Sequence, residues 1–275
     1  MNKTILITGA SSGFGKSSAK LFAANGWNVI ATMRSPEKEE ELTTIANICV
    51  LKLDVQDEPT IRKAIADGLA RFGSIDVLVN NAGYALRGVF ESLTKEQIKR
   101  QYDVNVFGLM DVTQAIIPYF RERGSGLIIN ISSMGGRITI PLLSLYHSTK
   151  FAVEGFTEAL SYELSAVNIR VKLIEPGGVR TNFGTTSIEE VPNGIQAYDE
   201  MIKYFQLNRP KVTQHMASPN ATSEEVAEVI FQAATDDTNR LRYVIGKDAE
   251  LYVNGRLNHN DQDYFELMNS YFLKS

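Results

Sequence analysis

Short apolar runs rich in β-branched residues alternate with longer stretches of helical periodicity along most of this chain. The first run, residues 3–8, leads into a cluster of glycines, and helical spacing follows from about Phe14 until Asn25 and Gly26 stop it. The same reasoning predicts further strands at residues 28–33, 48–53, 75–79, 127–131, 169–174 and 242–246. It predicts further helices at residues 36–46, 59–72, 95–121 and 145–166, after a capping box at Thr222 and Glu225, and at 262–273.

This alternation of strands and helices is typical of parallel βαβ units with right-handed crossovers. Several strands, among them residues 77–79 and 127–129, are apolar without alternation, which suits a sheet covered on both faces. The sequence therefore predicts an α/β fold, a doubly wound parallel sheet of about seven strands with helices on both faces.

The length of 275 residues and the hydrophobic content of 44% favour one globular domain over residues 1–275 and exclude a disordered chain. Residues 182–221 break the rhythm of strands and helices with many polar residues and with Pro192, Pro210 and Pro219. We therefore expect this segment to be an inserted loop or lid near a substrate site.

The charge balance and the cysteine count narrow the classes of partner. Lys and Arg number 28 against 32 Asp and Glu, and a net charge of -4 offers no basic field to nucleic acid or a membrane surface. The apolar run before Gly9 is too short for a signal peptide or a membrane span, so we expect a cytoplasmic protein. The single cysteine, Cys49, is expected to be a small buried hydrophobe rather than a nucleophile. No metal site is implied, because the three histidines lack metal-ligand spacing: His147, His215 and His259.

A glycine-rich turn follows the first predicted strand and reads Thr8-Gly9-Ala10-Ser11-Ser12-Gly13-Phe14-Gly15. In an open α/β sheet a ligand binds at the carboxyl ends of the strands, where glycine lets the backbone approach a pyrophosphate closely. The helix that begins here offers N–H groups and the positive end of its dipole to an anion. The turn therefore predicts a dinucleotide site, and an ordinary glycine-rich βα turn is the alternative.

Arg34 stands at the end of the second predicted strand, where an acidic residue would bind the ribose of NAD. A guanidinium in this place can pair with the additional phosphate of NADP, so the sequence favours NADP(H) over NAD(H). The alternative is an arginine that is solvated on a surface loop near Glu37 and Glu39.

Tyr146 and Lys150 are four residues apart in a predicted helix, which puts the phenol and the ammonium on neighbouring turns of one face. A phenol has a pKa of about 10, and a nearby cation favours its ionised form. Lys150 is therefore expected to lower the pKa of Tyr146 and make it a general acid and base near pH 7. A second pair with this spacing, Tyr243 and Lys247, begins in a predicted strand, where four residues span about 13 Å and the charges do not cooperate.

Ser132 and Ser133 follow the predicted strand 127–131, at the sheet edge where ligands bind. One of their hydroxyls is expected to hold a carbonyl oxygen beside Tyr146, although serines at a strand end are commonly caps only. Asn105 is unusual inside a helical stretch because asparagine competes with the helix hydrogen bonds, and it is expected to relay protons through a water.

From Thr4 to about Gly246 the chain resembles the short-chain dehydrogenase/reductase family, which has a Rossmann-type fold. Four motifs carry the resemblance: the turn at 8–15, Asn80-Asn81-Ala82-Gly83, the set Ser133, Tyr146 and Lys150, and Pro176-Gly177-Gly178-Val179. The resemblance implies a catalytic tetrad of Asn105, Ser133, Tyr146 and Lys150. Ser133 rather than Ser132 is then the active serine, because it lies 13 residues before Tyr146.

The resemblance also implies a set of cofactor contacts. Phe14 replaces the aliphatic residue usual between the last two glycines, and this change leaves the backbone contacts intact. The implied contacts are Gly9, Ser11, Ser12, Gly13, Phe14, Gly15, Arg34, Asp54, Val55, Val79, Asn81, Ala82, Gly83, Tyr146, Lys150, Pro176, Gly177, Val179 and Thr181.

The expected reaction is hydride transfer between a nicotinamide ring and the carbon of a small to medium apolar ketone or secondary alcohol, with steroid-like molecules among the candidates. Tyr146 passes the proton, Ser133 orients the oxygen, and Lys150 also binds the nicotinamide ribose. Fold alone does not select the substrate. The residues expected to select it are Met134, Leu142, Leu143, Phe183, Ile195, Tyr198, Met201 and Phe205, and the alternative for the last five is a helix packed on the core.

Three other functions stay open. One is an alcohol dehydrogenase that prefers NAD. Another is a catalytically silent nucleotide-sensing regulator on the same fold, which predicts a lost tyrosine or lysine, yet Tyr146 and Lys150 are both present. The third is a nucleotide-sugar epimerase or dehydratase, whose glycine spacing and longer C-terminal domain this sequence lacks. Family members usually pair through the helices predicted at 95–121 and 145–166, so we expect a homodimer or homotetramer.

Overall fold

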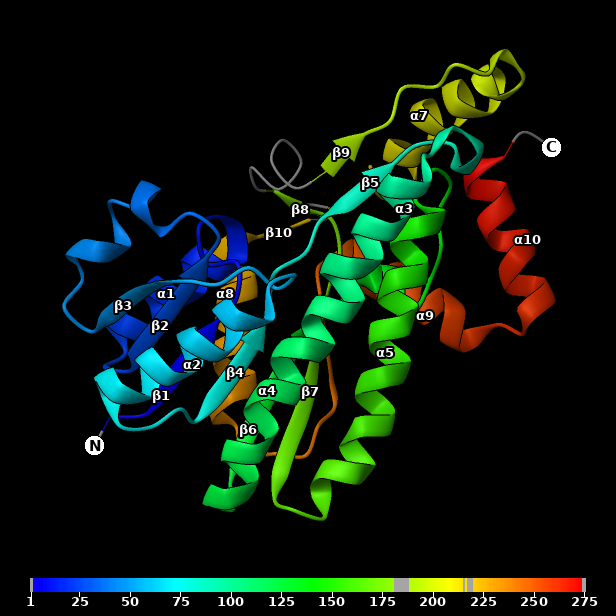
Figure 1. Ribbon diagram of the computed structural model, residues 1–275. Coiled ribbons are helices and arrows are strands. Elements are labelled where there is room, and N and C mark those ends of the chain that lie inside the picture. The colour runs from blue at the N-terminus through cyan, green and yellow to red at the C-terminus, as the bar shows by residue number, and fades with distance from the viewer. Residues whose placement is uncertain (1, 181–187, 215, 217–219, 274–275) are drawn as a thin grey trace.

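Seven parallel strands form one sheet in the computed structural model, which describes residues 2–180, 188–214, 216 and 220–273. Each neighbouring pair is parallel, and the strand order reverses between β1 and β4. The predicted doubly wound α/β fold is confirmed (Figure 1). From edge to edge the strands are β11 (Arg242–Ile245), β7 (Ile169–Pro176), β6 (Gly126–Ile131), β4 (Val77–Asn80), β1 (Thr4–Ile7), β2 (Asn28–Met33) and β3 (Ile48–Lys52).

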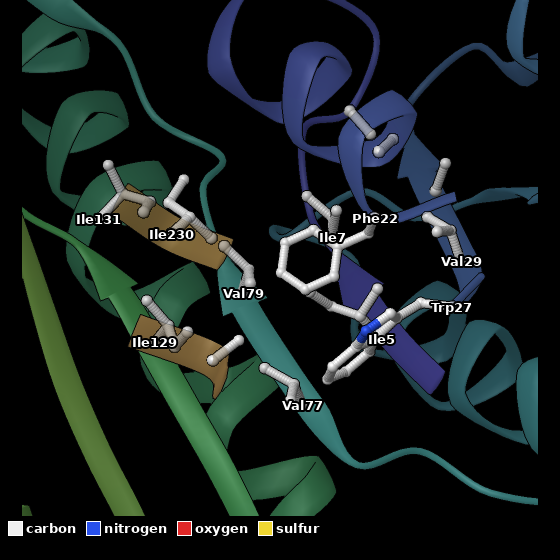
Figure 2. Packing of buried hydrophobic residues seen from close by; sticks show 14 of the residues in the cluster. Ile5, Ile7, Phe22, Trp27, Val29, Val77, Val79, Ile129, Ile131 and Ile230 are labelled. Carbon is white, nitrogen blue, oxygen red and sulfur yellow. The ribbon is translucent and has the colours of Figure 1, made fainter. Parts of the chain in front are cut away.

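Alternate residues of the central strands face two different layers of helices. Ile5 packs with Phe22 of α1 (Gly13–Ala24) and Ile230 of α8 (Ser223–Thr235), whereas Leu6 faces the opposite layer. Figure 2 shows the first of these clusters, in which the rings of Phe22 and Trp27 meet at 5.1 Å between centroids. Because both faces are buried, consecutive residues of the central strands are apolar, as in residues 5–7 and 77–79. The opposite layer consists of α2 (Glu58–Phe72), α4 (Gly108–Arg123) and α5 (Ser144–Ser165).

The helix predicted at 95–121 is two helices joined by a π-helical turn. α3 (Lys95–Tyr102) begins with a capping box between Thr94 and Gln97, the π turn covers Asp103–Phe107, and α4 follows directly. Hydrophobic periodicity does not reveal this change, because a π turn adds a single residue to one turn of an otherwise helical pattern. Asn105 lies in the π turn, so the residue that looked unfavourable in an α-helix occupies an irregular one.

The prediction of a helix at residues 36–46 is wrong. The segment forms two short 3-10 helices, Pro36–Lys38 and Leu42–Thr44. The buried carboxylate of Glu39 accepts hydrogen bonds from the backbone N–H of Glu41 and Leu42, at 3.0 and 2.9 Å, and so competes with a helical ladder. Leu42 is the only fully buried apolar side chain between residues 36 and 46, so no helical face is available for packing.

The segment predicted as a lid at 182–221 is more regular than a loop. Its described residues include β9 (Ile188–Glu190), which pairs with β5 (Ala85–Arg87), and α7 (Asp199–Thr213). The strand β10 (Ala221–Thr222) pairs with β8 (Val179–Arg180), and the capping box of Thr222 and Glu225 is confirmed. Periodicity did not reveal α9 (Lys247–Asn258), which begins two residues after β11, whereas the terminal helix is confirmed as α10 (Asp261–Phe272). Further 3-10 helices lie at Phe90–Ser92, Met134–Gly136 and Gln196–Tyr198.

Two features bear on the expectations about the cysteine and about a membrane span. Cys49 is half-buried rather than buried, because β3 is an edge strand, and burial raises the pKa of its thiol. A thiol with a raised pKa is a weaker nucleophile at neutral pH, as expected. Among the described residues no helix is long and apolar enough to cross a bilayer.

Candidate active site

The glycine turn after β1 has a backbone that only glycine accepts at two of its positions. Gly9 has a φ of 67°, and a Cβ there would lie 2.9 Å from the Cα of Ala82. A Cβ on Gly15 would lie 2.5 Å from both the carbonyl oxygen of Gly9 and the side-chain nitrogen of Asn81. The turn is therefore packed against the loop that follows β4, and its glycines are required sterically.

Asn81 fixes this turn to the end of β4. Its side-chain N–H groups donate to the carbonyl oxygens of Thr8 and Gly9, both at 2.9 Å. The hydroxyl of Thr8 accepts the backbone N–H groups of Asn81 and Ala82, at 3.0 and 3.1 Å. Two motifs that are far apart in the sequence thus form one rigid corner at the point where the strand order reverses.

A cavity of ≈ 410 Å³ opens at this corner and gathers most of the predicted cofactor residues. It lies at the carboxyl ends of the strands, where dinucleotides bind in such sheets. Gly15, Val79, Tyr146, Lys150, Pro176, Gly177 and Val179 do not line it, and Thr181 lies outside the described residues. The predicted residues that line it are Gly9, Ser11, Ser12, Gly13, Phe14, Arg34, Asp54, Val55, Asn81, Ala82 and Gly83.

Sequence reasoning missed several residues of this cavity. Tyr84 directly follows the Asn80–Gly83 motif, so its position was a usable signal, whereas Arg100 and Glu189 come from separate elements and reach the cavity only through the fold. The other unpredicted lining residues are Met33, Leu53, Gln56, Val104 and Ile188.

Arg34 is exposed at the rim of this cavity. The alternative reading placed it near Glu37 and Glu39, but within the described part of the chain Arg34 pairs with neither of them. Glu39 instead accepts from the ammonium of Lys16 at 2.9 Å. The guanidinium therefore carries a charge with no counter-ion from this loop.

The side chains of Ser133 and Tyr146 meet. Ser133 follows β6, and its hydroxyl accepts the backbone N–H of Gly135 at 3.0 Å, donates to the carbonyl oxygen of Pro176 at 3.3 Å, and interacts with the Tyr146 phenol in a way that lowers its pKa. The alternative, Ser132, is buried against Gly136, where a Cβ would lie 2.8 Å from the Ser132 oxygen. Geometry thus brings Ser133 rather than Ser132 to the tyrosine.

Lys150 lies one turn of α5 beyond Tyr146. Its Nζ is 5.8 Å from the centroid of the Tyr146 ring and donates to the carbonyl oxygen of Ile131 at 2.8 Å, at the end of β6. This bond holds the ammonium at the same sheet edge as Ser133.

The pKa of Tyr146 differs in direction from the expectation. Although part of the side chain is accessible, protein surrounds most of it, so burial raises the pKa of the phenol, and the hydrogen bond with Ser133 opposes this rise. Burial also lowers the pKa of Lys150 to about 8, against the attraction of the Glu154 carboxylate. Burial thus makes Lys150, the cation expected to lower the phenol pKa, lose its proton more readily. For Tyr146 itself, desolvation is the largest effect on the pKa, and it raises the pKa.

Asn105 is held by its side chain. Its Oδ1 accepts the backbone N–H of Tyr84 at 3.0 Å, and its Nδ2 donates to the Tyr84 carbonyl oxygen at 2.8 Å and to the Thr149 hydroxyl at 3.2 Å. Gly83 lies against it, since a Cβ there would be 3.2 Å from Oδ1. Because both amide donors are used, a relaying water has to bind a carbonyl acceptor of this residue.

The loop Pro176–Val179 is held by Asp248, a residue that the sequence did not indicate. Asp248 lies in the first turn of α9, and its Oδ2 accepts the backbone N–H of Gly178 at 2.7 Å. A Cβ on Gly177 would lie 2.2 Å from the other carboxylate oxygen, so glycine is required there. Burial raises the pKa of Asp248, and hydrogen bonds from backbone N–H groups oppose the rise.

Two residues near the motifs are structural. His147 is buried, its Nδ1 bonds the carbonyl oxygen of Gly135 at 2.8 Å, and its Nε2 accepts the N–H of Ile140 at 3.1 Å. Burial lowers its pKa to about 4, so it is neutral at pH 7. Tyr243 lies on β11 as predicted and accepts from the ammonium of Lys172 at 3.0 Å, away from Tyr146.

The residues expected to select the substrate divide into groups. Leu142 and Phe205 line a second cavity, whereas Ile195 and Met201 do not. Tyr198 donates to Glu91 at an exposed position, and Phe183 lies outside the described residues. Phe205 is buried in an apolar cluster with Met134, against which Leu143 also packs, so among the last five residues the alternative of core packing holds for Phe205.

Comparison with known proteins gives a consistent result. The family model described as short chain dehydrogenase matches residues 3–192. An uncharacterised oxidoreductase of Bacillus subtilis is 40% identical over 263 residues, which cover 91% of this chain and 92% of that protein. The structure of a short-chain dehydrogenase from Streptomyces avermitilis has a TM-score of 0.84 and 35% identity, covering 98% of this chain and 97% of that one.

Two further solved structures carry a nicotinamide cofactor. A 3-ketoacyl-(acyl-carrier-protein) reductase from Brucella melitensis complexed with NADH has a TM-score of 0.74 and 27% identity, covering 90% of this chain and 98% of that one. ElxO with NADP bound also has a TM-score of 0.74, with 28% identity, and covers 90% of this chain and 100% of that one.

Proposed function

The chain belongs to the short-chain dehydrogenase family and is an oxidoreductase, and from this we propose that it reduces a small to medium apolar ketone, or oxidises the corresponding secondary alcohol, with NADP(H). The observation that carries the proposal is that the Tyr146 phenol, the Ser133 hydroxyl and the Lys150 ammonium, which is 5.8 Å from the Tyr146 ring centroid, come together at the end of β6. A phenol beside a second hydroxyl can hold and protonate a carbonyl oxygen.

The residues at the glycine turn fit a dinucleotide. Gly13 has a φ of 53°, and a Cβ there would meet no atom within 4 Å, so the turn presents an open stretch of backbone to a pyrophosphate in the cavity. The side chain of Ser12 makes no capping hydrogen bond at the start of α1, so it does not itself occupy the N–H groups of that first turn. Arg34, without a counter-ion from its own loop, supports NADP(H) over NAD(H).

Each catalytic side chain has a separate role. The cofactor, when bound, supplies or accepts the hydride. Because burial raises its pKa, Tyr146 keeps its proton at neutral pH and can donate it from the phenol oxygen to a carbonyl oxygen. Ser133 orients that oxygen, Lys150 contributes positive charge and binds the nicotinamide ribose, and Asn105 supports a water that replaces the proton.

The test is absorbance at the reduced-nicotinamide band for wild type and Tyr146→Phe, with NADPH and NADH separately, against aliphatic, aryl and steroid ketones. We expect NADPH consumption that falls about 10²- to 10⁴-fold in the variant while cofactor binding is retained. Faster turnover with NADH would overturn the role of Arg34. Tight cofactor binding without turnover of any ketone would support the nucleotide-sensing regulator instead.

A homo-oligomer that pairs through α4 and α5 is part of this proposal. Phe107 before α4 is 53% exposed, and Phe151 and Tyr162 of α5 are 44% and 71% exposed. Large apolar side chains at one surface are typical of an interface. Light scattering after size exclusion is expected to give a dimer or tetramer, and a monomer at micromolar concentration would overturn it.

A further inference from the structure

A second cavity, of ≈ 560 Å³, lies between the β5–β9 pair and α7. Figure 1 shows these three elements gathered at the same end of the molecule. The volume is in the range that holds a ligand of drug size. Half of the lining residues have apolar side chains: Val89, Leu142, Val191, Ile202, Phe205 and Pro210.

Leu142 connects this cavity to the catalytic residues. It lies four residues before Tyr146, and its backbone has a φ of 68°, which is strained for leucine. Its carbonyl oxygen accepts the N–H of Gly88 at 2.9 Å, so the loop before α5 is tied to the end of β5. Phe205 of the same cavity packs in one cluster with Met134, which directly follows Ser133. One residue of the cavity wall, Leu142, thus belongs to the loop that leads to Tyr146, and another, Phe205, packs with the residue that follows Ser133.

The cavity contains two arginines with different surroundings. Arg87 is paired with the carboxylate of Glu190, and its Nε donates to that carboxylate at 3.0 Å. Arg209 of α7 is half-buried, and across the described residues its guanidinium makes no hydrogen bond and no ion pair. It lies 5.9 Å from the centroid of the Phe205 ring, one helical turn away, which orients it toward the cavity wall.

The environment of Arg209 compensates its charge only in part. Burial lowers the pKa of its guanidinium, and the nearby Arg87 lowers it further. The charge of the Asp248 carboxylate opposes this lowering, but within the described residues Asp248 makes no ion pair with Arg209, and its Oδ2 accepts the Gly178 N–H at 2.7 Å. A partly desolvated cation without a partner is costly, and in a ligand cavity an anion from the ligand relieves that cost.

We propose that Arg209 binds an acidic group of the substrate, so that the substrate is an apolar ketone carrying a carboxylate. This inference rests on the proposed oxidoreductase function and adds the charge of its substrate. A planar guanidinium accepts a carboxylate through two parallel N–H···O bonds, which fixes the orientation of the ketone as well as its affinity. The apolar walls around Leu142 and Phe205 would contact the hydrocarbon part of such a molecule.

The test uses matched pairs of probes, aryl ketones linked through a short methylene chain either to a carboxylate or to the corresponding carboxamide. With NADPH, we expect wild type to prefer the acid over the amide by about 10- to 100-fold in kcat/KM, the usual value of a hydrogen bond to a charged group. Arg209→Gln should remove this preference and leave kcat/KM for the amide unchanged, and Arg209→Lys should retain part of it. Lys203→Gln is the matched control, because Lys203 is an exposed cation on the same helix and does not line the cavity.

Equal use of acid and amide by wild type, or an acid preference that survives in Arg209→Gln, would overturn the inference. In either case turnover of the amide that depends on Tyr146 would show that the oxidoreductase function stands. Calorimetric titration of each probe into wild type and Arg209→Gln tests, without any turnover, whether Arg209 binds the carboxylate. Tighter binding of the acid that is lost in the variant supports the inference, and equal binding of acid and amide by wild type rejects it.

Discussion

The cofactor half of the molecule, residues 4–131, and its C-terminal region, residues 188–273, are built on different kinds of contact. In the cofactor half, parallel strands and a glycine turn define the site through the backbone, as at Gly9 and Gly15. In the part of the C-terminal region formed by α7, α9 and α10, the ordering contacts are between side chains of remote segments, such as the rings of Phe205 and Phe272 at 5.5 Å between centroids. Figure 1 shows α7 and α10 beside each other, far from β1 to β3.

The two regions differ in how strictly their contacts limit the choice of residues. A backbone that must approach a pyrophosphate accepts few residue types, so the cofactor half carries recognisable motifs. A region held by apolar side chains accepts many different residues as long as volume is kept, so its pocket can change while the fold persists. Substrate selection therefore belongs in the region whose sequence is least constrained.

The largest expected effect comes from removing one buried ring in each region, with Phe120→Ala and Phe272→Ala. Both side chains are almost fully buried, at 0% and 2% exposure, so each variant should lose about 3–5 kcal/mol in free energy of unfolding, measured with urea. Phe272→Ala should also raise the KM for the ketone while the cofactor Kd stays within about twofold. Phe120→Ala should leave both constants of the folded protein unchanged. A weakened cofactor Kd in Phe272→Ala would break the comparison.

Asp248 joins the C-terminal region to the Pro176–Val179 loop, which lies between the two regions in the sequence, and Asp248→Ala tests that link. Loss of the bond to the Gly178 N–H should free the Pro176–Val179 loop and lower kcat about 10- to 100-fold. Asp248→Asn keeps an acceptor oxygen of the same shape and should recover most of the loss. The assay uses a neutral ketone, so that any effect on Arg209 does not enter. Equal loss in both variants would mean that the negative charge, rather than the hydrogen bond, is required.

His147 of α5 also lies between the two regions in the sequence, and its pKa gives a test of how stability depends on pH. Burial lowers its pKa to about 4, whereas the unfolded chain binds the proton with a pKa near 6.5. The resulting stability is present above pH 6.5 and is lost as the pH falls towards 4. Between pH 7 and pH 5 wild type should lose about 2 kcal/mol more than His147→Gln, as measured by urea unfolding.

Two controls isolate this effect. Burial raises the pKa of Glu175 to about 7, so its contribution has the opposite sign, stabilising the fold as pH falls, and it is common to wild type and variant. His259→Gln, at an exposed position, should keep the wild-type slope. A His147→Gln slope equal to that of wild type would show that another group governs the acid response.

The sequence was informative wherever a contact is local or is made by the backbone. Apolar runs predicted every strand of the main sheet, and spacing predicted the residues that meet at the glycine turn and at Tyr146. It was misleading at residues 36–46, where the Glu39 side chain competes with the helix, and it missed α9 and Asp248, whose partner lies 70 residues away. The direction of the Tyr146 pKa also depends on burial, which no spacing reports.

The smallest expected effect tests whether local signals act equally in both regions. Thr94 caps α3 in the cofactor half and Thr222 caps α8 in the C-terminal region, each in a reciprocal capping box with the third residue of its helix. Because a cap satisfies backbone N–H groups irrespective of the tertiary contacts around it, Thr94→Ala and Thr222→Ala should each cost about 1 kcal/mol by urea unfolding. Equal costs would place the difference between the regions in their long-range contacts. A cost several times larger for Thr222→Ala would mean that the pairing of β8 with β10, which ends at this residue, stabilises the C-terminal region through its backbone as well.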